Sequence, residues 1–501
     1  MLDVIIIGSG YGGSAVAART APHAKVLLLE RGRAWRPGDF PESLLGLARA
    51  YHSARNPLGL WAMRLGRGTG NAYVSGLGGA SLVNYGITAS PPPHVFDRWP
   101  LTAADLAPDY ARALDVLRPT PYPGADALGD QAFLDRFEPG RRVDLANTID
   151  WARCTACGLC VPGCNRGAKR SLDQTYHPLA TAAGAELRPE REVTAFAPTP
   201  DGAWRVTVQR TGHPASAETL TTRHLVLAAG TFGTLDLLHR ERAHLPLSRH
   251  FGRDMTMNGD GLAFLYNTAH PLSGHDGAPI TTSARLPFTD RDGRTRVLNV
   301  MSGRIPKLAA RPSALTLALF AELLGPGRKG PRDPARARAL RRLRDLLATG
   351  PRGALAHTYM YKLDAEDSGR GYAVFDAAGR SALEWPDYAE DPILRFAAAR
   401  LEAWAAQIGG VLVPDVHALP LPGMRSFGVH PLGGARLGRT VDDGVTDPDG
   451  RVFRPDGTTY PGLRIADASL IPTSLGVPSS LTVAALGERV GASLARELGA
   501  P

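Results

Sequence analysis

Cysteine is scarce in this chain, and its placement is more informative than its number. The 501 residues include four cysteines, and all four fall in the run CTACGLCVPGC. Disulfides across such short gaps are not expected in a reducing compartment. We therefore treat these thiols as candidate ligands rather than as structural crosslinks.

Long apolar runs are missing as well. No segment approaches the roughly 20 apolar residues of a transmembrane helix, and the longest candidate, 314–321, is far shorter. Met1, Leu2 and Asp3 provide no positive region ahead of the first apolar run. With 44% hydrophobic and 21% charged residues, the composition is that of a globular protein and excludes disordered and fibrous classes. We expect a soluble, cytoplasmic protein of two or three domains.

The formal charge of +9 is modest for this length but concentrated, since residues 328–344 hold eight Lys or Arg and one Asp. Within this segment Leu340, Leu343 and Leu347 fall on one helical face. Three interpretations stay open: a solvated helix face, a membrane-surface or lid helix, or a nucleic-acid contact. Aromatic residues do not interleave with the charges, so no nucleic-acid partner is expected. Peripheral membrane contact through 328–347 remains a candidate.

Glycines at the N-terminus form the strongest motif. Residues 4–13 read VIIIGSGYGG, an apolar strand that turns at Gly8, Gly10 and Gly13, where the backbone can approach a pyrophosphate at a helix N-terminus. Glu30 closes the next apolar run, VLLLE, at the position from which a carboxylate binds the hydroxyls of a ribose. The motif predicts a dinucleotide site.

Further glycine turns and changes of pattern suggest the domain organisation. Two more turns expose backbone without side chains: GLGGASLVNYG from Gly76 and LAAGTFGT from Leu227. The pattern changes after about 270, where loops alternate with a basic helix and an amphipathic helix from Ile393 to Trp404. The nucleotide domain is therefore discontinuous. The expected parts are a cofactor domain (1–90, 176–270 and 421–501), a lid or connection (91–150), a cysteine-rich segment (151–175) and a substrate domain (271–420).

Taken together, these motifs resemble the glucose–methanol–choline flavoprotein oxidoreductases, in particular their cholesterol-oxidase-like branch. VHPLGGARLG from Val429 and YPGLRIADASLIPTSLGV from Tyr460 complete the set, and the resemblance spans almost the whole chain. It implies an α/β fold with a Rossmann-like FAD-binding domain and a smaller substrate domain of antiparallel sheet and helices. FAD is the implied cofactor. Residues implied to bind it are Gly8, Gly10, Gly13, Glu30, Gly78, Gly79, Ser81, Asn84, Val193 and Asp467.

The resemblance also implies the chemistry, which is hydride transfer from an alcohol carbon to flavin while a base removes the hydroxyl proton. His430 matches the active-site histidine of the family, and imidazole is a suitable proton acceptor near neutral pH. The usual second partner, an Asn or His after Gly-Val, is replaced by Pro478, which has no donor or base. Ser479 or Ser480, a residue of the substrate domain, or a different reaction could account for this departure. Glu366 and Asp367 are weaker candidates for an acidic group.

The spacing of Cys154, Cys157, Cys160 and Cys164 is that of a bacterial ferredoxin run. The fourth cysteine of such a run normally serves a second cluster, which this chain cannot build, and Asn165 replaces the usual proline. One iron–sulfur cluster, an empty thiol cluster and zinc remain open. A cluster would pass electrons to an external acceptor or redox protein and favour a dehydrogenase over an oxidase.

The leading hypothesis is an FAD-dependent oxidoreductase acting on an alcohol group of a bulky substrate, such as a steroid-like molecule. The first rival is flavin-dependent desaturation, isomerisation or reduction within a biosynthetic pathway. The second is a non-catalytic flavin or iron–sulfur electron carrier.

Overall fold

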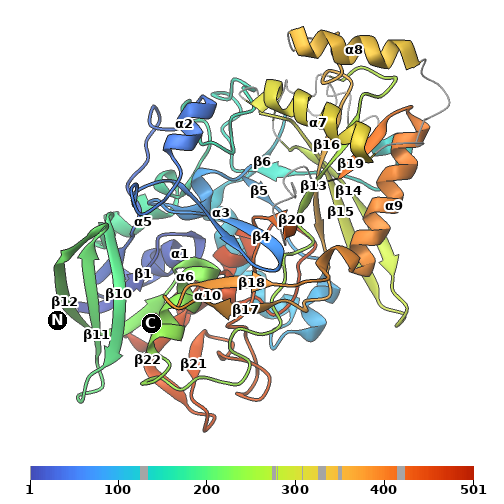
Figure 1. Ribbon diagram of the computed structural model, residues 1–501. Helices are drawn as coiled ribbons and strands as arrows, with labels where there is room; N and C mark the ends of the chain where they lie inside the picture. The colour runs from blue at the N-terminus through green and yellow to red at the C-terminus, as the bar shows by residue number, and fades with distance from the viewer. Residues whose placement is uncertain are drawn as a thin grey trace.

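The computed structural model describes residues 2–124, 134–272, 278, 280–306, 309–324, 335–347, 352–414 and 424–500. Two large sheets lie in separate parts of the molecule (Figure 1). One contains the nucleotide motif, and the other belongs to the expected substrate domain. This confirms the fold class predicted from the sequence. No helix among the described residues is long and apolar enough to cross a membrane.

The first sheet has eight strands and is built around the buried run of β1. β1 pairs in parallel with β2 and β12, and β12 pairs in parallel with β22, so several carboxyl ends meet at one edge. That edge is where doubly wound sheets bind nucleotides. The strands are β1 (Leu2–Ile7), β2 (Val26–Leu29), β9 (Glu186–Arg188), β10 (Arg191–Pro198), β11 (Trp204–Arg210), β12 (His213–Leu227), β21 (Arg451–Phe453) and β22 (Thr459–Ile465).

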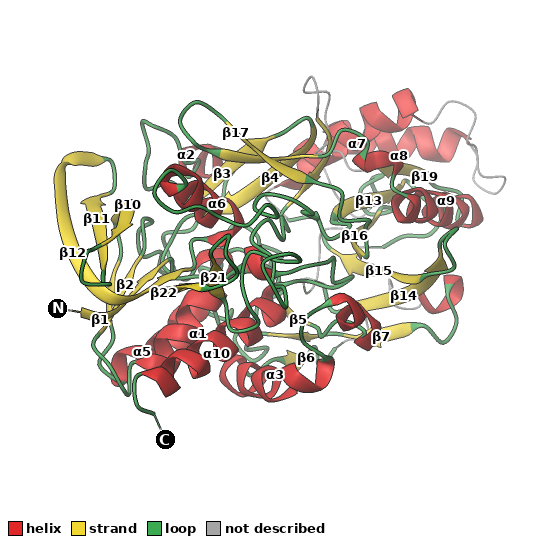
Figure 2. Ribbon diagram, turned by 90° about the horizontal axis from the view of Figure 1, so that it is seen from below, coloured by secondary structure: helices red, strands yellow, loops and turns green. Residues whose placement is uncertain are grey.

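Helices lie against this sheet (Figure 2). Small residues allow the first and the last of them to pack closely. A Cβ on Gly487 would lie 2.6 Å from the carbonyl oxygen of Gly12, so the first and last helices touch through their backbones. The expected connection over 91–150 contains a helix whose Tyr110 bonds Thr482 at 2.8 Å. The helices are α1 (Tyr11–Thr20), α3 (Ala103–Leu117), α5 (Tyr176–Ala182), α6 (Gly230–Glu241) and α10 (Ser480–Glu497).

The second sheet is antiparallel throughout and has six strands. It includes residues on both sides of the expected boundary at 270, because β16, which follows the boundary, pairs with β13, which precedes it, as well as with β15. The strands are β7 (Arg142–Asp144), β13 (Gly261–Tyr266), β14 (Thr282–Thr289), β15 (Thr295–Gly303), β16 (Tyr359–Ala365) and β19 (Val411–Pro414).

Helices cover both faces of this sheet. Ala263 and Leu265 of β13 share a core with α9 (Pro392–Gln407), whereas Phe264 and Tyr266 share one with α7 (Ala310–Leu324). Successive strand residues point to opposite faces, so Met360, Lys362 and Asp364 of β16 point to the same face as one another. α8 (Ala335–Leu347) lies beside α7.

Short elements join the two parts. β20 pairs in parallel with β4. The chain reaches His430 just after the end of β20. Residues 371–386 contain a hairpin, in which β17 pairs with β18. The remaining elements are α2 (Leu44–Arg49), β3 (Trp61–Leu65), β4 (Gly68–Val74), β5 (Ile87–Thr88), β6 (Thr120–Pro121), β8 (Ala146–Asn147), β17 (Tyr372–Phe375), β18 (Ser381–Glu384), β20 (Met424–Gly428) and the 3-10 helices η1 (Gly79–Leu82), η2 (Pro93–Arg98), η4 (Leu172–Gln174), η6 (Tyr388–Glu390) and η7 (Ala468–Leu470).

Candidate active site

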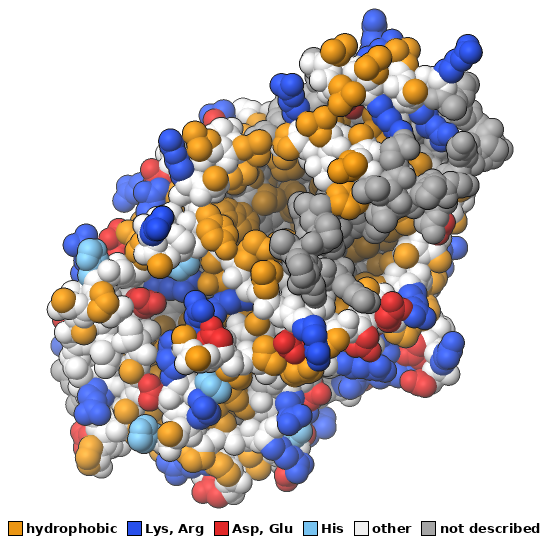
Figure 3. All heavy atoms as spheres, viewed as in Figure 1, with side chains coloured by type: hydrophobic (Ala, Val, Ile, Leu, Met, Phe, Trp, Pro, Cys, Tyr) orange, Lys and Arg blue, Asp and Glu red, His pale blue; other side chains and the backbone are white. Residues whose placement is uncertain are grey.

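A cavity of about 1470 Å³ extends from the nucleotide motif to the second sheet. Its walls include the turn after β1, the segment after β20, the start of α10 and side chains of β13 and β16. The space-filling view shows a hollow lined by hydrophobic side chains (Figure 3). The two ends of the chain thus contribute to one site.

The three N-terminal glycines have different surroundings. Gly8 has φ +104°, and a Cβ there would lie 2.1 Å from the carbonyl oxygen of Ala228. A Cβ on Gly13 would lie 2.1 Å from the carbonyl oxygen of Gly8, so this glycine permits close packing of α1 on β1. A Cβ on Gly10 would meet no atom within 4 Å, and Gly10 borders the cavity. Open space at this helix N-terminus fits a pyrophosphate.

Glu30 borders the same end of the cavity. It is buried, and its carboxylate accepts hydrogen bonds from the Ser9 hydroxyl and the Gly32 N–H, each at 2.7 Å. Ser9 in turn accepts from the N–H of Gly78 at 2.9 Å. Glu30 therefore ties together the first two glycine turns, and its position fits the predicted contact with a ribose.

In the second glycine turn, some residues border the cavity and others support the turn. Gly79 and Asn84 border the cavity, and Asn84 donates to the hydroxyl of Tyr11 at 2.8 Å. Gly78 has φ +111°, and its carbonyl accepts from the Ser81 hydroxyl at 2.7 Å. Of the residues expected to bind FAD, those along the cavity are Gly8, Gly10, Glu30, Gly79, Asn84, Val193 and Asp467, whereas Gly13, Gly78 and Ser81 stand behind its wall.

Asp467 lies at the start of η7, next to the N-terminus of α6. Its carboxylate accepts from the hydroxyls of Thr234 and Ser469 and from the Ser469 N–H. Burial raises the pKa of Asp467, although these hydrogen bonds oppose the rise. Its side chain is therefore fixed before any cofactor enters.

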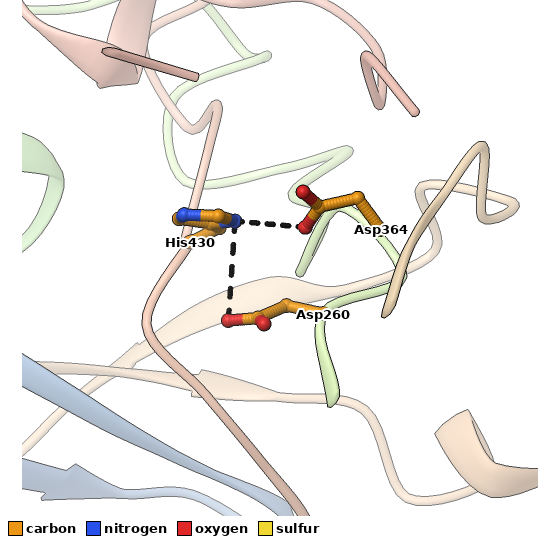
Figure 4. Close-up of side chains that lie close together, drawn as sticks. All are labelled: Asp260, Asp364 and His430. Carbon is orange, nitrogen blue, oxygen red and sulfur yellow. Dashed lines mark hydrogen bonds and ion pairs between the residues drawn. The ribbon is translucent and has the colours of Figure 1, made fainter. Parts of the chain in front are cut away.

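His430 borders the cavity and contacts a buried carboxylate (Figure 4). Its Nδ1 lies 3.1 Å from Asp364 Oδ1 and 3.9 Å from Asp260 Oδ2. Asp364 is fully buried on β16, and Asp260 immediately precedes β13, the neighbouring strand. When Nδ1–H donates to Asp364, Nε2 carries the free lone pair, as a general base requires.

Lys362 provides the positive charge of this cluster. Its ammonium contacts Asp364 Oδ1, lies 2.7 Å from Asp260 Oδ1 and donates to the carbonyl oxygen of Leu363 at 3.0 Å. The ammonium nitrogen also lies 3.5 Å from His430 Nδ1. An ammonium has three protons, so the two carboxylates and the carbonyl use its full donor capacity and leave none for a substrate. Three possible metal ligands, Asp260, Asp364 and His430, converge here, but the ammonium already compensates the carboxylates.

Charge pairing decides the protonation of the cluster. Burial alone would lower the pKa of Lys362, but the adjacent Asp260 and Asp364 outweigh it and raise that pKa. Burial alone would raise the pKa of Asp260, but Lys362 and His430 hold it below its ordinary value. Lys362 therefore stays charged and Asp260 ionised near neutral pH.

The closing segment is held by Asn258. Its side-chain oxygen accepts from the N–H groups of Leu475 and Gly476, and its amide donates to the carbonyl of Val477. Pro478, Ser479 and Ser480 follow and all border the cavity. The Ser480 hydroxyl donates to the carbonyl of Ile87 at 3.2 Å, whereas Ser479 makes no side-chain cap to α10.

Glu366 and Asp367, the weaker acidic candidates, do not border the cavity. Glu366 pairs with His94 at 2.8 Å. Asp367 accepts hydrogen bonds from Thr256 and Ser474 and supports the closing segment. The carboxylates beside His430 are Asp364 and Asp260, which the sequence interpretation missed.

The four cysteines surround a second, small pocket and form no disulfide. No three of their sulfurs lie within 4.8 Å of one another in the described structure, whereas sulfurs around one tetrahedral zinc at about 2.3 Å would be closer. Burial raises the pKa of Cys160 to about 12. The arrangement therefore does not match a preformed zinc site.

The cysteine segment adjoins the main cavity. Val161 and Pro162, which follow Cys160, border that cavity. Lys169 donates to the carbonyls of Cys160 at 2.9 Å, Leu82 at 2.6 Å and Asn84 at 3.0 Å, and burial lowers its pKa to about 8. One buried lysine thus connects the cysteine segment with the second glycine turn.

Comparisons with known proteins show which proteins this chain is similar to. Residues 139–243 and 423–487 match the N- and C-terminal family models described as GMC oxidoreductase. A cholesterol oxidase of Mycobacterium tuberculosis is 29% identical, covering 97% of this chain and 90% of the relative. A cholesterol oxidase of Acinetobacter baumannii is 24% identical, covering 97% and 93%. The solved structure of pyridoxine 4-oxidase from Mesorbium loti superposes with TM-score 0.62 and 15% identity over 98% and 99% of the two chains.

Proposed function

Because this chain belongs to the GMC oxidoreductase family of flavoproteins, we propose that it oxidises the alcohol group of a bulky, hydrophobic substrate with FAD as cofactor. One observation carries the proposal: His430 borders the cavity with its Nδ1 against a buried carboxylate. With Nδ1–H donating to Asp364, Nε2 is the proposed proton acceptor.

Each residue of the site has its own proposed role in the reaction. FAD, when bound, supplies the acceptor for the hydride that leaves the alcohol carbon. His430 Nε2 takes the hydroxyl proton, and Asp364 stabilises the imidazolium that results. Lys362, which is also paired with Asp260, holds Asp364 in place. Ser479, whose hydroxyl makes no helix cap, is the proposed second contact to the substrate oxygen, and Ser480 is the alternative.

The apolar wall supports a hydrophobic substrate. Four apolar side chains border the cavity on the side of the second sheet: Leu262 and Phe264 of β13, Met360 of β16, and Ile305. β13 and β16 also position the acidic residues and the lysine beside His430. Such a wall favours sterol-like or long aliphatic alcohols over sugars, because it offers few hydrogen bonds. The names of the relatives, cholesterol oxidases and a long-chain-alcohol oxidase of Arabidopsis thaliana, point to the same substrate class.

Anaerobic mixing of the FAD-loaded protein with sterols, long-chain alcohols and sugars tests the proposal. The expected result is bleaching of the flavin absorbance by a hydrophobic alcohol and none by a sugar. If no alcohol class reduces the flavin, the proposal fails. Repeating the mixing in the presence of oxygen or of an artificial acceptor distinguishes an oxidase from a dehydrogenase.

An iron–sulfur cluster at Cys154, Cys157, Cys160 and Cys164 is a second part of the proposal. Its support is the common pocket of the four cysteines and the position of Val161 and Pro162 on the main cavity. A cluster there would pass electrons to an external redox partner in the cytoplasm. Iron and acid-labile sulfide in anaerobically purified protein would support it. A pure flavin spectrum without iron, identical to that of Cys157→Ser, would exclude it.

Pro478 keeps a different flavin reaction open as a second candidate. Since proline provides no hydrogen bond to a substrate oxygen, desaturation or reduction would not need this position. These reactions predict flavin turnover with an unsaturated or saturated hydrocarbon group and none with an alcohol, so the same substrate panel separates the candidates. A purely electron-carrying protein would be reduced by a partner protein and by no small substrate.

A further inference from the structure

Two neighbouring helices, α7 and α8, expose an unusual number of leucines. Six of the fourteen exposed large apolar side chains among the described residues belong to them, and Leu347 is 77% exposed. Scattered exposed leucines need no explanation, but a group of them on one surface does. We call this group the leucine surface: Leu315, Leu319, Leu340, Leu343, Leu346 and Leu347.

α8 packs with its polar side toward the protein. Arg341 is buried and donates to Asn267 Oδ1 at 2.7 Å, and Arg342 lies over the ring of Tyr266 at 5.8 Å. Asp345 is also buried and accepts from the N–H of Leu355 at 2.7 Å. A helix of a globular protein normally buries its apolar face. The leucines of α8 therefore face outward because its polar residues have the inward partners.

α7 continues the leucine surface toward the cavity. Its inner stripe, including Ala314 and Leu317, is buried with Phe264 of β13, and Ser313 borders the cavity. Its outer stripe carries Leu315 and Leu319. The same helix therefore has one side on the cavity wall and another on the leucine surface.

Charge around the leucines identifies the kind of partner. Arg311, Arg336 and Arg344 are exposed on these two helices, whereas the acidic Asp345 is buried. Leucines bordered by arginines suit an anionic lipid surface, in which apolar side chains enter the headgroup boundary while cations remain with the phosphates. No described helix could span a bilayer, so the contact would be interfacial.

We propose that the leucine surface docks this protein on an anionic lipid bilayer. Docking would bring the α7 wall of the cavity to the membrane. α2 lies apart from α7 in the ribbon view (Figure 1). Leu44 and Leu45 of α2 are exposed, and Tyr51 and Leu65 border the cavity. Where the proposed function holds, a membrane-dissolved alcohol would enter between these elements. The docking itself does not depend on the reaction.

Cosedimentation of the FAD-loaded full chain with vesicles tests the proposal without any substrate. One set of vesicles contains phosphatidylcholine alone, and the other contains equal parts of phosphatidylcholine and phosphatidylglycerol. The protein is expected to bind the anionic vesicles more tightly. Leu343→Asp/Leu347→Asp should weaken this binding at least about tenfold, because two leucines leave the apolar phase and two like charges are added.

Leu179→Asp is the matched control, since Leu179 is an exposed leucine on α5, away from α7 and α8. It should bind vesicles as the parent protein does. Equal binding by the double variant, or no binding by the parent protein, overturns the proposal. A dimer in solution that the double variant dissociates also overturns it, because a second copy would then cover the leucines. Flavin reduction measured in detergent should be the same in both variants and the parent, which separates this test from that of the proposed function.

Discussion

The imidazole of His430 and the carboxylate of Asp364 face each other at 3.1 Å from Nδ1 to Oδ1, although 66 residues separate them. Asp364 is fully buried, and its Oδ2 has no hydrogen-bond partner among the described residues. A buried carboxylate in this place fixes the ring orientation and favours a cationic imidazole during proton transfer. It supports the base from behind rather than contacting the substrate.

Asp364→Asn should therefore slow flavin reduction while leaving FAD bound. General base catalysis accelerates a reaction roughly 10²- to 10⁴-fold. A misdirected imidazole should therefore lower the rate of flavin reduction by about 10²-fold. KM should change little, because Asp364 does not border the cavity. Stopped-flow absorbance measures the rate. Glu366→Gln, which alters a carboxylate two residues along, serves as control and should retain the parent rate; equal rates in all three proteins would contradict the assigned role.

Removal of Lys362 should destabilise the fold more than it alters cofactor binding. Lys362→Met leaves Asp260 and Asp364 buried without their counter-ion, which costs about 3–5 kcal/mol for comparable buried pairs. The double variant Asp260→Asn/Lys362→Met should recover part of this loss because it removes one unpaired charge. Urea unfolding measures both. A single variant as stable as the parent would contradict the pairing.

The same cluster predicts a pH window for stability. The pKa of Asp260 is depressed in the folded state, so its contribution is present above the ordinary value of 3.8 and is lost as the pH falls through the folded pKa. The pKa of Lys362 is raised, so its contribution is present below 10.5 and is lost as the pH rises through the folded pKa. The stability difference between the parent and Asp260→Asn/Lys362→Met should thus be flat near neutral pH and should change outside that window. A stability difference that is the same at every pH would contradict the pairing of Lys362 with Asp260.

Two glycine substitutions should separate cofactor binding from folding. Gly10→Ala places a methyl group in open cavity space, so the protein should fold normally and bind FAD at least about tenfold more weakly. Gly13→Ala places its methyl group 2.1 Å from the carbonyl oxygen of Gly8 and should lower the melting temperature even without FAD. Thermal unfolding of the apoprotein and FAD titration distinguish them. The reverse pattern would contradict the assigned positions.

Local signals made the cofactor half of the site predictable. Strand, glycines, helix and Glu30 follow one another within thirty residues, so their spatial relation depends on a single strand–helix unit. The family resemblance added His430 and the later glycine turns. Ser81 and Gly78 were expected along the cofactor and do not border the cavity. The Ser81 hydroxyl donates to the Gly78 carbonyl, so both residues support the turn, and their contact with FAD stays a prediction.

The cluster around His430 could not be predicted in the same way. Asp260, Lys362 and His430 are distant in sequence and meet only because β13 and β16 pair and β20 ends beside them. One signal was present: the buried strand YMYKLDA holds a lysine and an aspartate two residues apart, on one face.

The basic segment was predicted as a helix, and α8 confirms this for 335–347, while residues 328–334 lie outside the described residues. A solvated helix face was one of three interpretations of its charges, beside a membrane-surface or lid helix and a nucleic-acid contact, and Arg336 and Arg344 are indeed exposed. Arg341 and Arg342 instead turn inward, because Asn267 and Tyr266 offer them partners that the sequence pattern alone does not show.

The most direct test of the central claim is the anaerobic rate of flavin reduction by a hydrophobic alcohol in the parent protein and in His430→Ala, both loaded with FAD. If His430 is the proton acceptor, the variant should bind FAD normally and reduce it roughly 10²- to 10⁴-fold more slowly. If the two proteins reduce the flavin at equal rates, His430 is not the base and the account of this site is wrong.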